Sequence, residues 1–581
     1  MKTTLFVVAF IILGYTARTQ EKEILLKLHC NDNEEDLPFR ISHYPRHFRD
    51  SSAVVTELQN ILLLSYKKGF LCATYDSIIF NDSVSVDAYF SSGIPYKCGT
   101  VSFRNIEEAV LGKTGIREKQ YSCTEFDFSR ITDAQERLIS YYEDRGYPFA
   151  GVKLDSFIID STALYAQCIV EKNTYYQIDS IIIKGNVKIS RNYLCRYLGI
   201  MTGDPYNDER LNNLSSRMKE LTFLSETKSF ELSFRENKAD LYLYLQRKKA
   251  NQFYGILGVL PNNTTTGKLL LTGDVRLSLL NSFGKGEALD FTWQKLQTST
   301  QRLDLVFVYP YLFNTPAGCD AKFSLFKKDT TYLTVNYSLG LLYMLHGGNF
   351  AKVYAERTTS TILSSSGLEN LTALPPYADV SSFIYGLGYR FYKLDYRFNP
   401  RKGVSLDADI GAGNKTIVRN ASVPDVVYEG VRLRSVQAEA VAEAALYIPF
   451  GRKMTLMIRN RSGHINNSFL FENELFRLGG LRTIRGFDEE SVTASSYSVM
   501  TLEYRFLYER NSNFYVFADG AWYEKDLPES YISDTPFAFG IGTSLETRAG
   551  IFTISYAMGS QFDNPVEIRS AKIHFGYMNR F

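Results

Sequence analysis

The sequence predicts a series of small α+β domains followed by a sixteen-stranded antiparallel transmembrane β-barrel. Two patterns in the 581 residues support this fold class. Residues 22–249 alternate strand-like and helix-like runs, whereas apolar and polar residues alternate with a period of two from about residue 251. The chain is 45% hydrophobic, yet beyond the first twenty positions no apolar run approaches the roughly 18 residues of a membrane helix.

Residues 1–20 predict a cleaved secretory signal. Lys2 precedes the apolar stretch 5–13, which is shorter than a membrane span, and the cleavage site is expected within residues 16–20. An uncleaved N-terminal anchor is the alternative. Export implies a compartment in which disulfides persist. Six of the seven cysteines precede residue 200: Cys30, Cys72, Cys98, Cys123, Cys168 and Cys195. They could form disulfides or be small buried apolar residues, and their spacing identifies no pair.

Residues 21–249 predict three α+β units in tandem, at 21–98, 99–176 and 177–249. In the middle unit a strand is followed by a helix and a hairpin, and the same order precedes and follows it. Gly146 is the expected stop of the middle helix. The apolar positions with helical spacing are Ile131, Leu138, Ile139 and Tyr142. A single larger α/β domain is the alternative to three units.

Residues 250–581 predict the barrel. About sixteen alternating segments are separated by turn sequences, and many reach the roughly 9–11 residues that cross a bilayer at a tilt. One face of the segment 332–345 carries Leu333, Val335, Tyr337, Leu339, Leu341, Tyr343 and Leu345. A soluble sandwich also shows alternation. The sustained apolar face, the strand lengths and the final strand, which ends at Phe581, favour a barrel.

Composition and motifs exclude several function classes. The formal net charge of +2 argues against a strongly basic nucleic-acid-binding protein. The six histidines form no H-E-x-x-H motif, and no cysteine pair has zinc-site spacing. Asp407 and Asp409 fit a lumen-facing pair better than a calcium site. We therefore predict no catalytic residues, no metal and no cofactor, and the protein is not expected to be an enzyme.

A sequence near residue 485 carries a family resemblance. Arg485, Gly486 and Phe487, preceded by Gly479 and Gly480, resemble the signature of the Omp85 superfamily of outer-membrane barrels, which includes BamA-type and TamA-type assembly proteins. The following segments MTLEYRFLY and FYVFADGAWYE resemble the next family strands. Residues 177–247 resemble a POTRA domain through their strand, Gly-Asn, paired helices and Gly-x-Pro-Tyr sequence. The resemblance covers essentially the whole chain after the leader.

The resemblance implies where the functional residues lie. The signature is expected at the tip of a loop, about residues 463–495, that folds back into the barrel lumen. Arg485 has a planar group that binds carboxylates through two hydrogen bonds, and Glu503 and Asp519 are the expected partners. Alternation places Glu503 in the lumen but would also put Tyr515 and Phe517 on the same face as Asp519.

The resemblance also implies a function. It predicts an outer-membrane protein of a Gram-negative bacterium, with its N-terminal arm in the periplasm, that helps fold and insert β-barrel or autotransporter-type proteins. Its partners would be unfolded outer-membrane clients, outer-membrane lipid and accessory periplasmic or lipoprotein subunits. A seam between residues 252–260 and 571–581 would receive the client strand. The seam residues of the last strand are Phe575, Gly576, Tyr577 and Phe581. A two-partner-type polypeptide secretion pore of the same superfamily is the alternative.

Overall fold

The computed structural model describes most of the chain after the predicted leader, and residues 1–20 lie outside the part described. The described residues are 24–30, 47–81, 85–94, 96–122, 128–160, 163–261, 269–297, 300–364, 368–371, 373–562 and 564–581. They form two compact units, Met1–Gln177 with Pro205–Glu209, and Ile178–Asp204 with Arg210–Phe581. Among the described helices, none is both long and apolar enough to cross a bilayer.

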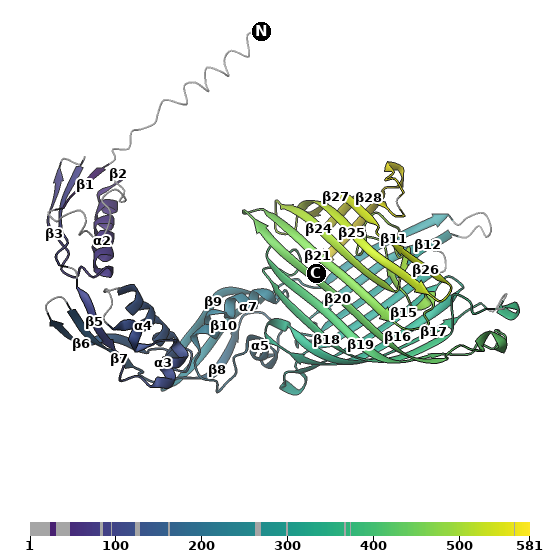
Figure 1. Ribbon diagram of the computed structural model, residues 1–581, viewed down its shortest axis with the longest axis horizontal. Helices are drawn as coiled ribbons and strands as arrows, with labels where there is room; N and C mark the ends of the chain where they lie inside the picture. The colour runs from purple at the N-terminus through teal and green to yellow at the C-terminus, as the bar shows by residue number, and fades with distance from the viewer. Residues whose placement is uncertain are drawn as a thin grey trace, which may run out of the picture. The chain divides into compact units, whose positions relative to one another are not determined.

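In its described residues, the first α+β domain has one helix and a four-stranded sheet of order β2-β1-β4-β3 (Figure 1). Its elements are β1 (Ile24–Cys30), β2 (His47–Phe48), α2 (Ser51–Lys67), β3 (Thr74–Asn81) and β4 (Ser85–Ser91). Helix α2 begins after Asp50, whose carboxylate accepts a hydrogen bond of 2.8 Å from the backbone N–H of Ala53. Such a cap satisfies a backbone donor that the first helical turn leaves without a partner.

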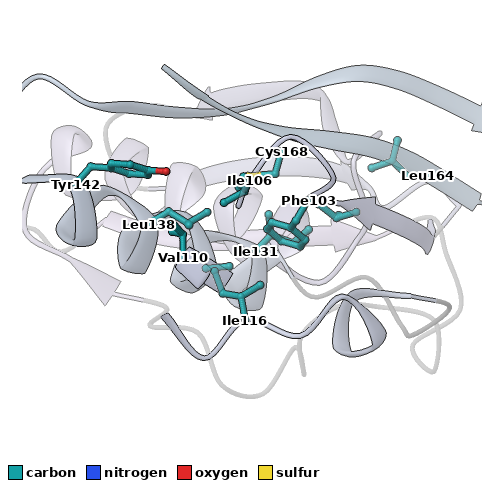
Figure 2. Packing of buried hydrophobic residues seen from close by; sticks show 11 residues of the cluster. Phe103, Ile106, Val110, Ile116, Ile131, Leu138, Tyr142, Leu164 and Cys168 are labelled. Carbon is teal, nitrogen blue, oxygen red and sulfur yellow. The ribbon is translucent and has the colours of Figure 1, made fainter. Parts of the chain in front are cut away.

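The second α+β domain has the sheet order β5-β7-β6. Its elements are β5 (Lys97–Ser102), α3 (Glu108–Thr114), α4 (Phe128–Glu143), β6 (Gly151–Asp160) and β7 (Ala163–Glu171). Helix α4 buries Ile131, Leu138 and Tyr142, which were expected from their helical spacing, together with Ala134. Figure 2 shows Ile131, Leu138 and Tyr142 packed with Phe103, Val110 and Cys168 in one apolar core.

The third α+β domain repeats the strand, helix, strand, strand order, with the sheet order β8-β10-β9. Its elements are β8 (Gln177–Lys184), α5 (Arg191–Leu198), α6 (Asp208–Asn212), α7 (Leu214–Glu220), β9 (Leu224–Arg235) and β10 (Lys238–Arg247). Strand β10 buries Ala239, Leu241, Leu243 and Leu245 on one face. This period of two is the pattern of a strand with one face against helices.

The thiols of Cys72, Cys168, Cys195 and Cys319 form no disulfide. Cys168 and Cys195 are buried, as small apolar residues would be. The side chains of Cys98 and Cys123 lie outside the described part, so a disulfide involving them stays a prediction.

The C-terminal region is the predicted closed antiparallel barrel of sixteen strands, counted over the described residues (Figure 1). Its segments are β11 (Gln252–Pro261), β12 (Leu269–Leu280), β13 (Ala288–Gln297), β14 (Thr300–Tyr309), β15 (Ala317–Lys328), β16 (Tyr332–Met344), β17 (Phe350–Ile362), β18 (Val380–Leu394), β19 (Gly403–Ile417), β20 (Arg434–Phe450), β21 (Met454–Asn466), β24 (Ser496–Leu507), β25 (Asn513–Leu527), β26 (Ser530–Asp534), β27 (Phe537–Glu546), β28 (Ile551–Ser560) and β29 (Lys572–Arg580). Segments β26 and β27 both pair with β25 and together act as one strand, interrupted at Pro536. Proline cannot donate to a strand ladder, which accounts for the break.

The two faces of the barrel strands differ as the alternation predicts. On β16, Tyr337, Leu339 and Leu341 are exposed on the outer face, while Ser338 between them is buried on the lumen side. Several lumen-facing charges are paired: Arg390 contacts Asp407 at 2.7 Å and Lys352 contacts Asp409 at 2.8 Å. An apolar exterior around a polar interior is the arrangement of a membrane barrel.

The third α+β domain contacts the short turns at one end of the barrel. The side-chain amide of Asn281, in the turn after β12, donates to the carbonyl of Lys188 at 3.0 Å. Tyr193 lies against Gly286 of the same turn, where a Cβ atom would come within 1.9 Å of the tyrosine ring. The longer loops after β17, β19 and β21 are therefore at the opposite rim, because alternate connections of an antiparallel barrel lie at opposite ends.

Candidate functional site in the barrel lumen and at the seam

A long loop, residues 467–495, joins β21 to β24 and folds into the lumen. It starts later than residue 463, because Gly463 to Asn466 still pair with β20. The loop contains a short hairpin of β22 (Phe476–Leu478) and β23 (Val492–Ala494). Ile484 and Phe487 from the loop are buried with Val499 of β24 and Ala521 of β25, so the loop shares an apolar core with the barrel wall.

Gly479 and Gly480 are required by the backbone of this loop. Both have positive φ, +112° and +91°. A Cβ atom at Gly479 would come within 2.2 Å of the carbonyl oxygen of Asp488, across the base of the loop. The backbone N–H of Gly479 also donates to the hydroxyl of Thr483 at 2.7 Å. Glycine is therefore needed both for the left-handed conformation and for the close approach of the two arms of the loop.

Arg485 reaches both carboxylates that the sequence singles out. Its Nε and Nη2 donate to the two oxygens of Asp519 at 2.8 and 2.7 Å, and its Nη1 donates to Glu503 at 2.5 Å. Its backbone N–H also donates to Asp519, at 3.1 Å. The guanidinium lies 3.5 Å from the ring centroid of Phe517. All three charged residues are buried, so the geometry is that of a buried ion pair with its hydrogen bonds satisfied.

Strands β24 and β25 place the two carboxylates on the lumen face. On β24, Met500 and Leu502 are exposed on the outside and Glu503 is buried inside. On β25 strict alternation holds, so Tyr515 and Phe517 share the lumen face with Asp519. An aromatic residue on the lumen face has a function here: the guanidinium of Arg485 stacks on the ring of Phe517.

Gly486 and Phe487 fit against β28. A Cβ atom on Gly486 would lie 2.9 Å from the backbone nitrogen of Gly559. A Cβ atom on Gly559 would in turn lie 2.8 Å from the ring of Phe487. The loop tip therefore packs directly on the barrel backbone at a position where both partners lack a side chain.

Further ion pairs hold the loop, and the sequence did not indicate them. Arg505 donates to the second oxygen of Glu503 at 2.7 Å, so Asp519, Arg485, Glu503 and Arg505 form a row of alternating charge. Other loop carboxylates pair with distant strands, as in the pairs Arg302 with Glu490 at 2.7 Å, Lys572 with Asp488 at 2.8 Å and Lys415 with Glu474 at 2.6 Å. Alternation could have placed Lys415 in the lumen, but its partner lies 59 residues away in an irregular loop.

The seam between the first and last strands is short. Strand β11 pairs with β29 at only three positions, Gln252 with Arg580, Phe253 with Asn579 and Tyr254 with Met578. The same strand pairs with β12 at every position from Gln252 to Pro261. Most of β29 therefore pairs with β28 on one side but has no paired residue of β11 on the other. This unpaired part includes Phe575, Gly576 and Tyr577.

Two further contacts flank the three paired positions of the seam. The hydroxyl of Tyr254 donates to the carbonyl of Phe575 at 3.4 Å, and the backbone N–H of Phe581 donates to the carbonyl of Asn251 at 3.0 Å. Phe575 and Phe581 are half exposed on the outer side.

In the described residues, no group of three or more histidine, cysteine, aspartate or glutamate side chains is arranged to bind a metal ion.

The comparisons with known proteins agree with this architecture. The Omp85 superfamily domain matches residues 281–581, more than half of the chain. The POTRA domain, a surface antigen variable number repeat, matches residues 176–245. The outer membrane protein assembly factor BamA of Nitratidesulfovibrio vulgaris (strain Hildenborough) is 22% identical over 217 residues, which are 35% of this chain and 26% of the relative. The aligned region thus spans about a quarter of that protein's length.

Two solved structures share the fold. CdiB from Escherichia coli superposes with a TM-score of 0.54 at 15% identity, over 91% of this chain and 98% of that one. CdiB from Acinetobacter baumannii gives a TM-score of 0.50 at 14% identity, over 84% of this chain and 89% of that one.

A POTRA domain followed by a closed sixteen-stranded barrel with an inward loop defines an outer-membrane barrel protein of a Gram-negative bacterium. The chain belongs to the Omp85 superfamily.

Proposed function

We propose that this protein is an assembly factor that helps fold and insert other β-barrel or autotransporter-type proteins into the outer membrane, with its three N-terminal domains in the periplasm. The observation that carries this proposal is the seam, where β11 and β29 share only three paired positions. Unpaired strand edges in the bilayer are costly, because no water is available to satisfy their backbone groups. A client strand that pairs with β29 would supply those missing hydrogen bonds.

Assembly at such a seam needs no covalent chemistry. Long-range strand pairing is slow and exposes aggregation-prone edges, so a preformed edge in the membrane would template the first pairing of the client. The edges of the periplasmic sheets could receive the client in the same way before insertion. The partners would then be unfolded outer-membrane proteins, outer-membrane lipid and accessory periplasmic or lipoprotein subunits.

The lumen loop argues against the alternative, a two-partner-type secretion pore. A polypeptide crossing the lumen would have to displace residues 467–495, which are held by Arg485 and by ion pairs to β14, β19 and β29. The matched relative named as an assembly factor supports the same choice. The likeness to the two CdiB structures concerns the fold and does not favour either function.

Depletion of the protein separates the two functions. We expect the amounts of several unrelated outer-membrane barrels to fall and their unfolded forms to accumulate in the periplasm, with recovery when the wild-type chain is restored. The measurement is quantitative proteomics of outer-membrane and periplasmic fractions. Unchanged barrel proteins together with periplasmic retention of one secreted soluble protein would instead favour the secretion pore.

A further inference from the structure

The outer surface of the barrel has a recess floored by small residues between strands β18 and β25. Register partners on adjacent strands form a row across this surface, with an aromatic residue at each end and four small residues between them. The row is Tyr389, Ala408, Ala442, Ser462, Ser498 and Trp522. These residues line a recess of about 700 Å³. Alternation puts all six on the membrane-facing side, opposite the lumen charges.

A second row runs beside the first, one step nearer the rim with the long loops. Its members are Leu387, Ile410, Ala440, His464, Ser496 and Glu524. Polar groups within each row form hydrogen bonds: Ser462 lies 3.0 Å from Ser498 in the first row, and His464 lies 2.8 Å from Ser496 in the second. These serine and histidine groups of the floor already have hydrogen-bond partners, which lowers the cost of covering them with an apolar chain.

Strand β20 connects this floor to a cationic recess at the rim. Arg432 and Arg434 line a hollow of about 890 Å³ together with side chains of Asn414, Thr416, Asn466 and Asn467. Among the described residues, neither arginine makes an ion pair, whereas nearby Arg419 is paired with Asp425 at 3.1 Å. We call the two recesses together, from Arg432 just before β20 to Ala442 on β20, with the neighbouring strands, the outer trough.

We propose that the outer trough binds a phosphorylated lipid of the outer leaflet. The rim with the arginines lies opposite the turns that contact the third α+β domain, so with that domain in the periplasm it faces the outer leaflet. Two arginines without acidic partners, beside asparagine amides, supply the donors that a phosphate monoester requires. A neutral headgroup would leave both charges without a counterion.

The length of the trough fits an acyl chain below the phosphate. From Arg434 to Ala442 the strand advances about 26 Å, at roughly 3.3 Å per residue. Ala438, Ala440 and Ala442 project less than the flanking Tyr389 and Trp522, so a chain can lie along β20 between the aromatic walls. A membrane helix of a partner protein would also suit a small-residue floor, but it would have no use for two unpaired cations.

Binding to the full chain in non-ionic detergent tests the proposal, with native mass spectrometry as the readout. The probes are bisphosphorylated lipid A, dephosphorylated lipid A and phosphatidylglycerol. We expect lipid A to bind the wild-type chain at least tenfold more tightly than the other two lipids. The double variant Arg432→Gln with Arg434→Gln should lose that preference, while Arg548→Gln, an exposed arginine in the turn at the other end of the barrel, should keep it.

A second variant tests the floor separately. Ala440→Leu with Ala442→Leu fills the trough on the membrane side without touching the lumen, so the barrel should fold and the acyl chain should lose its place. We expect weaker binding of both forms of lipid A, with unchanged heat-dependent mobility on electrophoresis. Equal lipid A binding by the wild-type chain and the arginine double variant would overturn the proposal. Equally tight binding of dephosphorylated lipid A or phosphatidylglycerol would overturn it as well.

Discussion

The guanidinium of Arg485 forms a two-bond pair with the carboxylate of Asp519, with Nε and Nη2 donating at 2.8 and 2.7 Å. The two residues are 34 positions apart, one at the tip of the lumen loop and the other in the middle of β25. Because both are buried, the pair fixes the loop to the wall only while both charges are present. The stability of the barrel and the position of the loop are therefore coupled.

Replacement of Arg485 by alanine should destabilise the barrel. The change leaves Asp519 without its main partner and Glu503 with Arg505 alone, and loss of one member of a buried pair costs about 3–5 kcal/mol. We expect the temperature at which the folded electrophoretic form converts to the unfolded form to fall. Arg485→Lys should lose less, because it keeps the charge but not the planar two-bond geometry.

A turn arginine provides the matched control for this change. Arg452 is exposed between β20 and β21, so Arg452→Ala should leave the conversion temperature unchanged. If Arg485→Ala behaves like this control, the loop is not held by the lumen contact.

Gly559 should tolerate no side chain, because Phe487 occupies the space next to it. A Cβ atom there would lie 2.8 Å from the phenylalanine ring, so Gly559→Val should push the loop tip from the wall at a cost of about 1–3 kcal/mol. Gly520 is the control, since no atom lies within 4 Å of its potential Cβ, and Gly520→Ala should be neutral. Limited proteolysis of the loop checks both variants. Equal protection of the Gly559→Val loop and the wild-type loop would contradict the packing.

The stability of the third α+β domain should depend on pH through Glu220, which lies against Gly347 of the turn after β16. Burial raises the pKa of this carboxyl group, although it accepts a hydrogen bond of 3.0 Å from Tyr197. A carboxyl group with a raised folded pKa favours folding below its unfolded pKa and loses that contribution as pH rises through the folded value. Relative to wild type, Glu220→Gln should therefore gain thermal stability as the pH rises above the ordinary carboxyl range, where the buried carboxyl group must ionise. A difference that does not change with pH would refute this account.

The thiol of Cys168 should be unreactive in the folded protein. Burial in the core of the second α+β domain raises its pKa to about 11, and alkylation requires the thiolate. At pH 8 we expect an alkylating reagent to modify the exposed Cys72 and to reach Cys168 only in denaturant, as peptide mass mapping would detect. Equal rates at both cysteines without denaturant would show that this core opens readily.

Much of this architecture could be predicted from the sequence because the local patterns agree with the tertiary structure. Alternation located the lumen face of β24, and the Arg-Gly-Phe signature with its two preceding glycines located the inward loop. The interruption of the fourteenth strand at Pro536 follows from the missing N–H of proline.

The partners across the lumen could not be predicted in the same way. Alternation specifies which face a side chain occupies, but not its height in the barrel or which loop residue will lie opposite it. Lys415 and Glu474 are buried together at 2.6 Å, and Phe517 underlies Arg485, only because the strand tilt and the loop path bring them there. The number of paired residues at the seam is likewise a property of the closed barrel.

A disulfide across the seam tests the central proposal most directly. Phe253 lies directly opposite Asn579 on one side and Leu277 on the other, so Phe253→Cys can be combined with Asn579→Cys or with Leu277→Cys. One pair is hydrogen-bonded and the other is not, but the Cα separations of both pair types are within disulfide range. The first combination locks the seam, and the second links β11 to β12, which stay paired. We predict that the seam disulfide lowers assembly of other outer-membrane barrels, that reductant restores it, and that the control disulfide has no effect. Normal assembly with the seam fully crosslinked would contradict the account.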